Sequence, residues 1–222
     1  QLVLFLKRVV LEQEFVAAGF DVAEMNKRGI KNVLALRGDI PAEMENEDRS
    51  GWDHQFAVDL IREIKESGFD FCIGGACYPE IHPESPNQKE DIKHLKEKIE
   101  AGCEFLTTQM FFDNNLLYNF LYKIREAGIT VPIVAGIMPI TNAKQVDRAI
   151  KLSGSFMPQR FKSLVDKFGS DPLAMKQAGI AYATDQIIDL YANGVENVHV
   201  YSMNKPDVAQ KIQSNLSDIL GK

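Results

Sequence analysis

The segment FCIGGACYPEIHPES (residues 71–85) is followed by DIKHLKEKIEAG (91–102) and CEFLTTQMFFD (103–113), and these three pieces define the architecture of the chain. Two apolar runs bounded by turn residues flank a polar, helical segment. This pattern predicts strand, loop, helix and strand in that order. We interpret it as a βαβ unit, in which a crossover helix joins two parallel strands.

Polar side chains follow both predicted strands of this unit. The loop after the first strand contains, among prolines, Tyr78, Glu80, His82 and Glu84. The second strand leads into Thr107, Thr108, Gln109 and Asp113. Loops at the carboxyl ends of parallel strands carry the chemistry in α/β folds. We therefore expect both groups of side chains at one rim of the sheet.

Three further strands are predicted at residues 31–39, 131–140 and 195–204, and helical patterns separate all five. No hairpin signal interrupts this alternation, which is typical of a parallel sheet with crossover helices. The fold class predicted is α/β, a (βα)8 TIM barrel lacking its first two or three strands, because only five strands are clear. Residues 1–20 remain unplaced, either helix or strand packed on the body, and residues 21–222 are expected to form a single domain.

The composition excludes several classes of protein. The net charge is −6 and the pI is about 5.3, which argues against a nucleic-acid surface. The apolar segment at residues 1–10 is too short to span a bilayer, and its basic residues follow the apolar run, unlike those of a signal peptide. Cys72, Cys77 and Cys103 form neither a CxxC motif nor an even set. We expect buried, reduced thiols and a cytoplasmic location, with no membrane partner.

The common phosphate and zinc motifs GxGxxG, P-loop and HExxH are missing from this sequence. Gly74 and Gly75 fit either a close approach of a ligand to the backbone or a strand kink. His82 with Glu80 and Glu84 could bind a metal, as in a metal-dependent barrel hydrolase, but ordinary loop composition explains them better. We therefore expect no metal.

Asp39 is the most suggestive carboxylate. It follows Gly38 at the end of an apolar strand and precedes a proline, so we expect it at the rim. The alternative is an ion pair with Arg37 that has no functional role.

Six pieces of the sequence resemble one known family. They are NVLALRGDIP, CYPEIHPES, LKEKIEAG, TQMFFD, IVAGIMPITNAKQ and HVYSMN. In this order and at these separations they are similar to bacterial-type methylenetetrahydrofolate reductase, a flavin enzyme of one-carbon metabolism and methionine biosynthesis. The resemblance runs from about Glu24 to about Ala209. It implies a (βα)8 barrel with noncovalent FAD at the carboxyl ends of its strands.

The resemblance also implies roles for individual residues. The positions that match FAD contacts are Arg37, Gly38, Asp39, Tyr78, His82, Ser85, Asp91 and Lys98. Those that match folate contacts are Gln109, Gln145 and Lys205. Asp39 is the expected catalytic residue, a carboxylate that disfavours the anionic reduced flavin. Two positions depart from the family pattern. The family often has alanine at the position of Ser85 and more often arginine at the position of Lys205. An ammonium group cannot repeat the bidentate contact of an arginine.

The activity implied is ping-pong reduction of 5,10-methylenetetrahydrofolate to 5-methyltetrahydrofolate. NADH or NADPH gives hydride to the flavin and leaves, and the folate then accepts hydride on its methylene carbon. A homo-oligomer or a partner subunit is expected. The alternative is a noncatalytic barrel subunit that binds a partner chain through an exposed sheet edge.

The family's early strands do not match this sequence. They carry FEFFPP, whose glutamate is the general acid, and then TYGA-like and HLTC-like segments. Glu12 and Glu14 lie in a different context, so the acid role is not assigned to them. Without the acid, proton transfer would be slower by roughly a hundredfold or more. We expect that the sequence is part of a longer protein.

Overall fold

A computed structural model describes residues 3–7, 22–37 and 54–221, which fall into two compact units. Unit 1 comprises the described residues up to Cys77 together with Ile92–Leu106, and unit 2 comprises Tyr78–Asp91 and the described residues from Thr107 onward. Helix α4 (Gln88–Glu100) and strand β4 (Phe105–Thr108) each contribute residues to both units. In the described residues, no helix combines the length and apolar character needed to cross a membrane.

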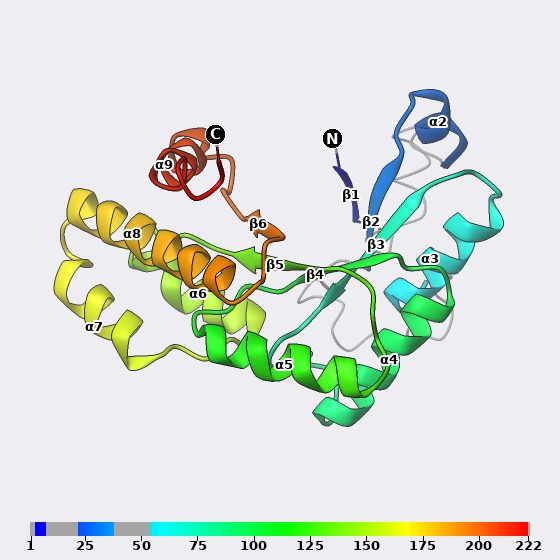
Figure 1. The fold of residues 1–222 in the computed structure, drawn as a ribbon, viewed down its shortest axis with the longest axis horizontal. Helices are drawn as coiled ribbons and strands as arrows, with labels where there is room; N and C mark the ends of the chain where they lie inside the picture. Colours follow the sequence, from blue (N-terminus) through cyan, green and yellow to red (C-terminus); the bar gives the residue numbers. More distant parts are fainter. Residues whose placement is uncertain (1–2, 8–21, 38–53, 222) are drawn as a thin grey trace, which may run out of the picture. The chain divides into compact units, whose positions relative to one another are not determined.

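Unit 1 is built on neighbouring strands in the order β1, β2, β3 and β4 (Figure 1). The first three are β1 (Val3–Lys7), β2 (Asn32–Leu36) and β3 (Cys72–Cys77). Parallel registers pair Phe5 with Leu34 and Leu34 with Gly74. The Glu104 amide donates to the Ile73 carbonyl at 2.7 Å, where β4 joins β3. Helices α2 (Val22–Lys27) and α3 (Ala57–Glu66) belong to this unit.

Strand β1 was not among the five predicted strands. Residues 3–7 of the unplaced segment form it, so six strands are described. The five-residue apolar run at residues 2–6, followed by Lys7 and Arg8, shows no period that separates helix from strand. Pairing with β2 decides the conformation.

The two glycines of β3 accommodate protein side chains. A Cβ at Gly74 would lie 2.2 Å from Cζ of Phe105, and a Cβ at Gly75 would lie 3.1 Å from the Cys103 sulfur. Neighbours within unit 1 thus fill the space in which a ligand could have approached the backbone. Tight packing, not ligand access, accounts for this pair.

Unit 2 contains the end of β4 followed by β5 (Ile133–Ile137) and β6 (Val198–Val200). Strands β5 and β6 are parallel, with Gly136 opposite His199. The helices are α5 (Asn114–Glu126), α6 (Lys144–Ser153), α7 (Gln159–Phe168), α8 (Pro172–Ala192) and α9 (Pro206–Asn215). Helix α8 contacts both α7 and α9 (Figure 1).

Short polar signals start the helices of unit 2. The Asp113 side chain accepts from the Asn115 amide, and Asp171 accepts from two amides of α8, which has Pro172 in its first turn. These are ordinary N-terminal caps. Before α6, Asn142 supplies the side-chain acceptor, to the Lys144 amide at 2.9 Å.

The core of unit 2 is an aromatic cluster between the β4–α5 loop, α7 and α8. The Phe112 and Phe161 rings stack with centroids 4.8 Å apart, and Tyr182 lies against Phe161. The Tyr182 hydroxyl donates to the Phe112 carbonyl at 2.6 Å, so the buried polar group is satisfied. This core fixes the loop after β4. The α/β class with parallel strands and crossover helices is confirmed.

Candidate active site

The loop after β3 is held in shape by Asp91, at the start of α4. One carboxylate oxygen accepts from the His82 amide at 3.1 Å, and the other accepts from the Ser85 hydroxyl at 3.2 Å. Asp91 is only 7% exposed. A buried carboxylate with two donors forms a rigid anchor. Asp91 therefore positions the loop, and its predicted contact with a cofactor stays a prediction.

Two aromatic side chains stand together in this loop. The Tyr78 and His82 rings meet edge to face with centroids 4.5 Å apart, and both are half-buried. Nδ1 of His82 accepts from the Glu84 amide at 3.1 Å. That bond assigns the proton of the neutral imidazole to Nε2. Nδ1 of His82 is thus the acceptor of the ring, and Nε2 is the nitrogen that can donate.

Glu80 connects the same loop to the segment after α6, through the backbone of Phe156. One oxygen, Oε2, accepts from the Phe156 amide at 2.7 Å, whereas Oε1 is buried and has no hydrogen-bond partner in the part of the chain that the structure describes. Burial raises the pKa of the Glu80 carboxyl, the Phe156 amide lowers it, and Asp113 raises it. Burial is the largest of these effects, so the charged form of this carboxyl is disfavoured.

The predicted cofactor residues of unit 1 follow β2 and lie on α4. The Lys98 ammonium donates to the Ala76 carbonyl in β3 at 2.9 Å. Arg37 directly follows β2. Gly38 and Asp39 lie outside the described residues, so the structure does not bear on their predicted roles.

Gln109 directly follows β4, and its amide has a defined orientation. Its oxygen Oε1 accepts from the amide of the next residue, Met110, at 2.8 Å. The Met110 carbonyl in turn accepts from the Ser155 hydroxyl, also at 2.8 Å. Because the oxygen is engaged, the Gln109 side chain offers its NH2 group to a ligand.

Gln145 and Lys205 belong to the two loops after β5 and β6. The Lys205 ammonium donates to the Thr141 hydroxyl at 2.9 Å, which links the β6–α9 loop to the β5–α6 loop. Gln145 lies in the first turn of α6, where its backbone N–H donates to the Asn142 carbonyl at 3.0 Å. Gln145 and Lys205 are both half-buried.

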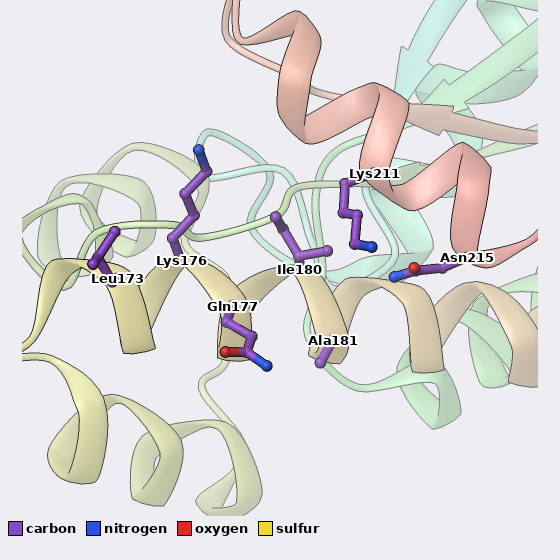
Figure 2. A pocket seen from close by; sticks show the side chains of 7 residues that line it. All are labelled: Leu173, Lys176, Gln177, Ile180, Ala181, Lys211 and Asn215. Carbon is purple, nitrogen blue, oxygen red and sulfur yellow. The ribbon is translucent and has the colours of Figure 1, made fainter.

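Unit 2 also has a surface hollow between α8 and α9. Leu173, Lys176, Gln177, Ile180 and Ala181 line it from α8, and Lys211 and Asn215 line it from α9 (Figure 2). None of the residues predicted for a site is among them.

The metal alternative does not fit the geometry of the loop after β3. Glu80 is directed to the Phe156 amide and His82 to the Glu84 amide. In the described ranges, no three His, Cys, Asp or Glu side chains are placed to hold a metal ion.

Comparison with known proteins identifies the family. The family model described as "Methylenetetrahydrofolate reductase" matches residues 14–217. The chain belongs to the methylenetetrahydrofolate reductase family. The family predicted from the sequence motifs is thus confirmed.

Two relatives illustrate the extent of the match. The chain is 41% identical over 180 residues to methylenetetrahydrofolate reductase 2 of Saccharomyces cerevisiae, covering 79% of this chain and 30% of that protein. It is 34% identical over 184 residues to 5,10-methylenetetrahydrofolate reductase of Escherichia coli, covering 83% and 60%. The chain therefore spans about a third of the yeast relative and under two thirds of the bacterial one.

A solved structure from Clostridium thermocellum has a similar fold, with a TM-score of 0.54 and 13% identity over 98% of this chain and 73% of that one. It is described as an uncharacterized protein that binds two copies of 5-methyl-5,6,7,8-tetrahydrofolic acid. At this identity the likeness concerns the fold alone. Together with the family match, it agrees with the predicted barrel class.

Two residues near the predicted site, Ser155 and Tyr201, had no role in the sequence interpretation. Ser155 contacts the Met110 carbonyl, and Tyr201 contacts the Thr108 carbonyl. Their partners are 45 and 93 residues away along the chain, so no local spacing identifies them. Glu80 was noticed only as a possible metal ligand.

Proposed function

We propose that this protein reduces 5,10-methylenetetrahydrofolate to 5-methyltetrahydrofolate, with FAD as cofactor and NADH or NADPH as electron donor. The observation that carries the proposal is the family match over residues 14–217, which includes the whole loop after β3 and the ends of β4, β5 and β6. Location in the cytoplasm and assembly into an oligomer are parts of the same proposal.

The loop residues of unit 2 fit a flavin dinucleotide in their chemistry. Tyr78 and His82 form a half-buried aromatic pair suited to packing against a planar or sugar group. Nε2–H of His82 can donate to a phosphate oxygen, and Asp91 keeps the loop in one conformation. When bound, FAD supplies the hydride chemistry.

Lys98 of unit 1 supports the same assignment independently. Its ammonium uses one donor on the Ala76 carbonyl, and an ammonium group suits a diphosphate as a point charge. Its contact with Ala76 keeps the charged end beside the carboxyl end of β3. We assign Arg37, Gly38 and Asp39 to the cofactor on the family resemblance alone.

Folate recognition is assigned to Gln109, Gln145 and Lys205. Both glutamine amides can bond to the polar edge of a pterin. The Lys205 ammonium lies in the loop after β6, where its bond to Thr141 fixes it. The general acid implied by the family is not assigned to any residue of this chain.

The test uses the purified chain with added FAD. We expect a flavin absorption spectrum that bleaches anaerobically with NADH or NADPH and returns when 5,10-methylenetetrahydrofolate is added, with 5-methyltetrahydrofolate identified by mass spectrometry. Protein that stays colourless after incubation with FAD would overturn the proposal. If such protein is recovered only with a companion chain, the noncatalytic subunit becomes the better explanation.

A matched pair of variants on α4 sharpens the test. Lys98→Met removes the charge but keeps an unbranched side chain, so we expect FAD affinity to fall about tenfold, as for loss of a charge-assisted hydrogen bond. Lys96→Met changes an exposed lysine of the same helix and should leave FAD affinity unchanged. Equal FAD affinity of the two variants would remove Lys98 from the site.

A further inference from the structure

We propose that Ser155 is a positioning residue that fixes the amide of Gln109 as a hydrogen-bond donor toward the folate, and that Glu80 holds Ser155 in place. This inference rests on the proposed function, because it assigns Gln109 to the substrate. It adds two residues to the site and states which side of the Gln109 amide meets the ligand.

The first step is the bond between Gln109 and its neighbour. Oε1 of Gln109 accepts from the Met110 amide at 2.8 Å. A glutamine amide can rotate by half a turn and exchange its oxygen and nitrogen, so a partner is needed to select one orientation. The Met110 N–H lies in the peptide plane between Gln109 and Met110, so it makes that selection only while the backbone torsions that join this plane to the Met110 carbonyl are fixed.

Ser155 fixes the Met110 backbone from the other side. Its hydroxyl donates to the Met110 carbonyl at 2.8 Å, and Ser155 is only 5% exposed. The bond connects the segment after α6 to the first residues after β4. Breaking it leaves a partly buried carbonyl without this partner, and the Met110 backbone is then free to move toward another one.

Ser155 is itself held from both sides. Its amide donates to the Ser153 hydroxyl at 3.1 Å, and the amide of Phe156 donates to Oε2 of Glu80 at 2.7 Å. Glu80 lies in the loop that carries Tyr78 and His82. Within unit 2, a chain of hydrogen bonds thus runs from the predicted cofactor loop to the predicted folate residue.

The state of Glu80 indicates that this link has a function besides stability. Oε1 is fully buried and lacks a hydrogen-bond partner in the described part of the chain, an arrangement that costs free energy. Strained groups of this kind concentrate where a site is positioned. The negative charge of Asp113 adds to the effect of burial, because both raise the pKa of Glu80.

The test compares three variants of the full chain for binding of 5-methyltetrahydrofolate by calorimetry. Ser155→Ala removes the hydroxyl, and we expect binding to weaken about tenfold, the effect of one hydrogen bond at the upper end of the usual range. Ser155→Thr keeps a hydroxyl and should restore binding to within a few-fold of wild type. FAD affinity should be the same in the wild type and in both Ser155 variants.

Thr184→Val is the matched control for lost stability. It also removes a buried hydroxyl that donates to a backbone carbonyl, that of Ile180 in α8 at 2.8 Å, and that accepts from the Asn215 side chain of α9 at 3.4 Å. Folate binding should be unaffected by it. The inference is overturned if Ser155→Ala binds folate as tightly as wild type, or if Thr184→Val weakens binding equally.

A second measurement separates this inference from the proposed function. Side-chain NH2 resonances of Gln109 and hydrogen exchange of the Met110 amide report the geometry without any ligand. We expect faster exchange and a shifted Gln109 signal in Ser155→Ala. Unchanged NMR signals with normal folate binding refute the inference alone, whereas wild-type protein that binds no folate refutes the proposed function.

Discussion

The Tyr201 hydroxyl donates a hydrogen bond to the Thr108 carbonyl at 2.8 Å, and the Tyr201 ring passes over Gly136 to reach it. The Thr108 hydroxyl accepts from the Gly136 amide, also at 2.8 Å. These two bonds tie together the ends of β4, β5 and β6 in unit 2. The three strand ends carry the residues assigned to folate, so their relative positions depend on a glycine that leaves room for the tyrosine ring.

Gly136→Ala should destabilise the protein. The added Cβ would lie 2.3 Å from the Thr108 oxygen and 2.6 Å from Cε2 of Tyr201, and the backbone atom cannot give way easily. We expect the free energy of unfolding to fall by about 1–3 kcal/mol, the usual cost of overpacking. Urea denaturation measures it. Tyr201→Phe keeps the ring and should lose only about 1 kcal/mol. Wild-type stability of Gly136→Ala would show that the strand ends can separate freely.

Glu80→Gln should stabilise the protein more at pH 8 than at pH 4.5. Burial raises the pKa of Glu80 in the folded state, so the folded protein holds this proton more tightly than the unfolded chain. The resulting stabilisation is present at low pH and is lost as the pH rises through the folded pKa. Glutamine keeps an oxygen for the Phe156 amide and carries no charge.

Thermal denaturation at both pH values measures this effect. Glu84→Gln, at an exposed position of the same loop, is the control. The same gain at both pH values for Glu80→Gln would contradict the assignment of a raised pKa.

Asp91→Asn should loosen the loop after β3. An amide nitrogen cannot accept, so either the His82 amide or the Ser85 hydroxyl loses its partner. We expect a loss of about 1–3 kcal/mol in unfolding free energy, faster hydrogen exchange at His82 and weaker FAD binding. Ser85→Ala removes only one of the two bonds and should have the smaller effect. Equal exchange rates in Asp91→Asn and wild type would show that the loop is held by other contacts.

Cys103 should react slowly with alkylating reagents in the folded protein. Burial, partly offset by Lys98, raises the pKa of its thiol from 9.0 to about 11. At pH 8 this leaves roughly a hundredfold less thiolate than an ordinary cysteine has. Peptide mass spectrometry after iodoacetamide treatment measures the rate, with urea-unfolded protein as the control. Rapid labelling of folded protein would mean that the thiol is accessible and ionised.

Asp39→Asn tests the role that the family resemblance implies for this carboxylate. Removing a negative charge beside the flavin should favour the anionic reduced form, which raises the reduction potential, by roughly 30 mV per 1.4 kcal/mol for a two-electron couple. Folate reduction should become slower. Asp59→Asn, in the first turn of α3, is the control. A potential equal to that of wild type would exclude Asp39 as the tuning residue.

The sequence predicted much of the site because its signals are local. The order of strand, loop and helix around Tyr78 and His82 follows from apolar period and turn residues, and the structure contains it. Asp113 and Asp171 begin helices by bonding to amides two or three residues away. The motif resemblance likewise led to the correct family. The specific roles of the site residues stay predictions.

Tertiary structure alone decided the strand at residues 3–7 and the contacts that orient the site. The bonds from Ser155 to Met110 and from Tyr201 to Thr108 join residues 45 and 93 positions apart. A periodic pattern reports only which face of an element is buried. The partner of a buried hydroxyl is set by how strands and helices pack. The sequence therefore determined five of the six described strands and the family to which the chain belongs, and packing determined the strand at residues 3–7 and which polar groups meet.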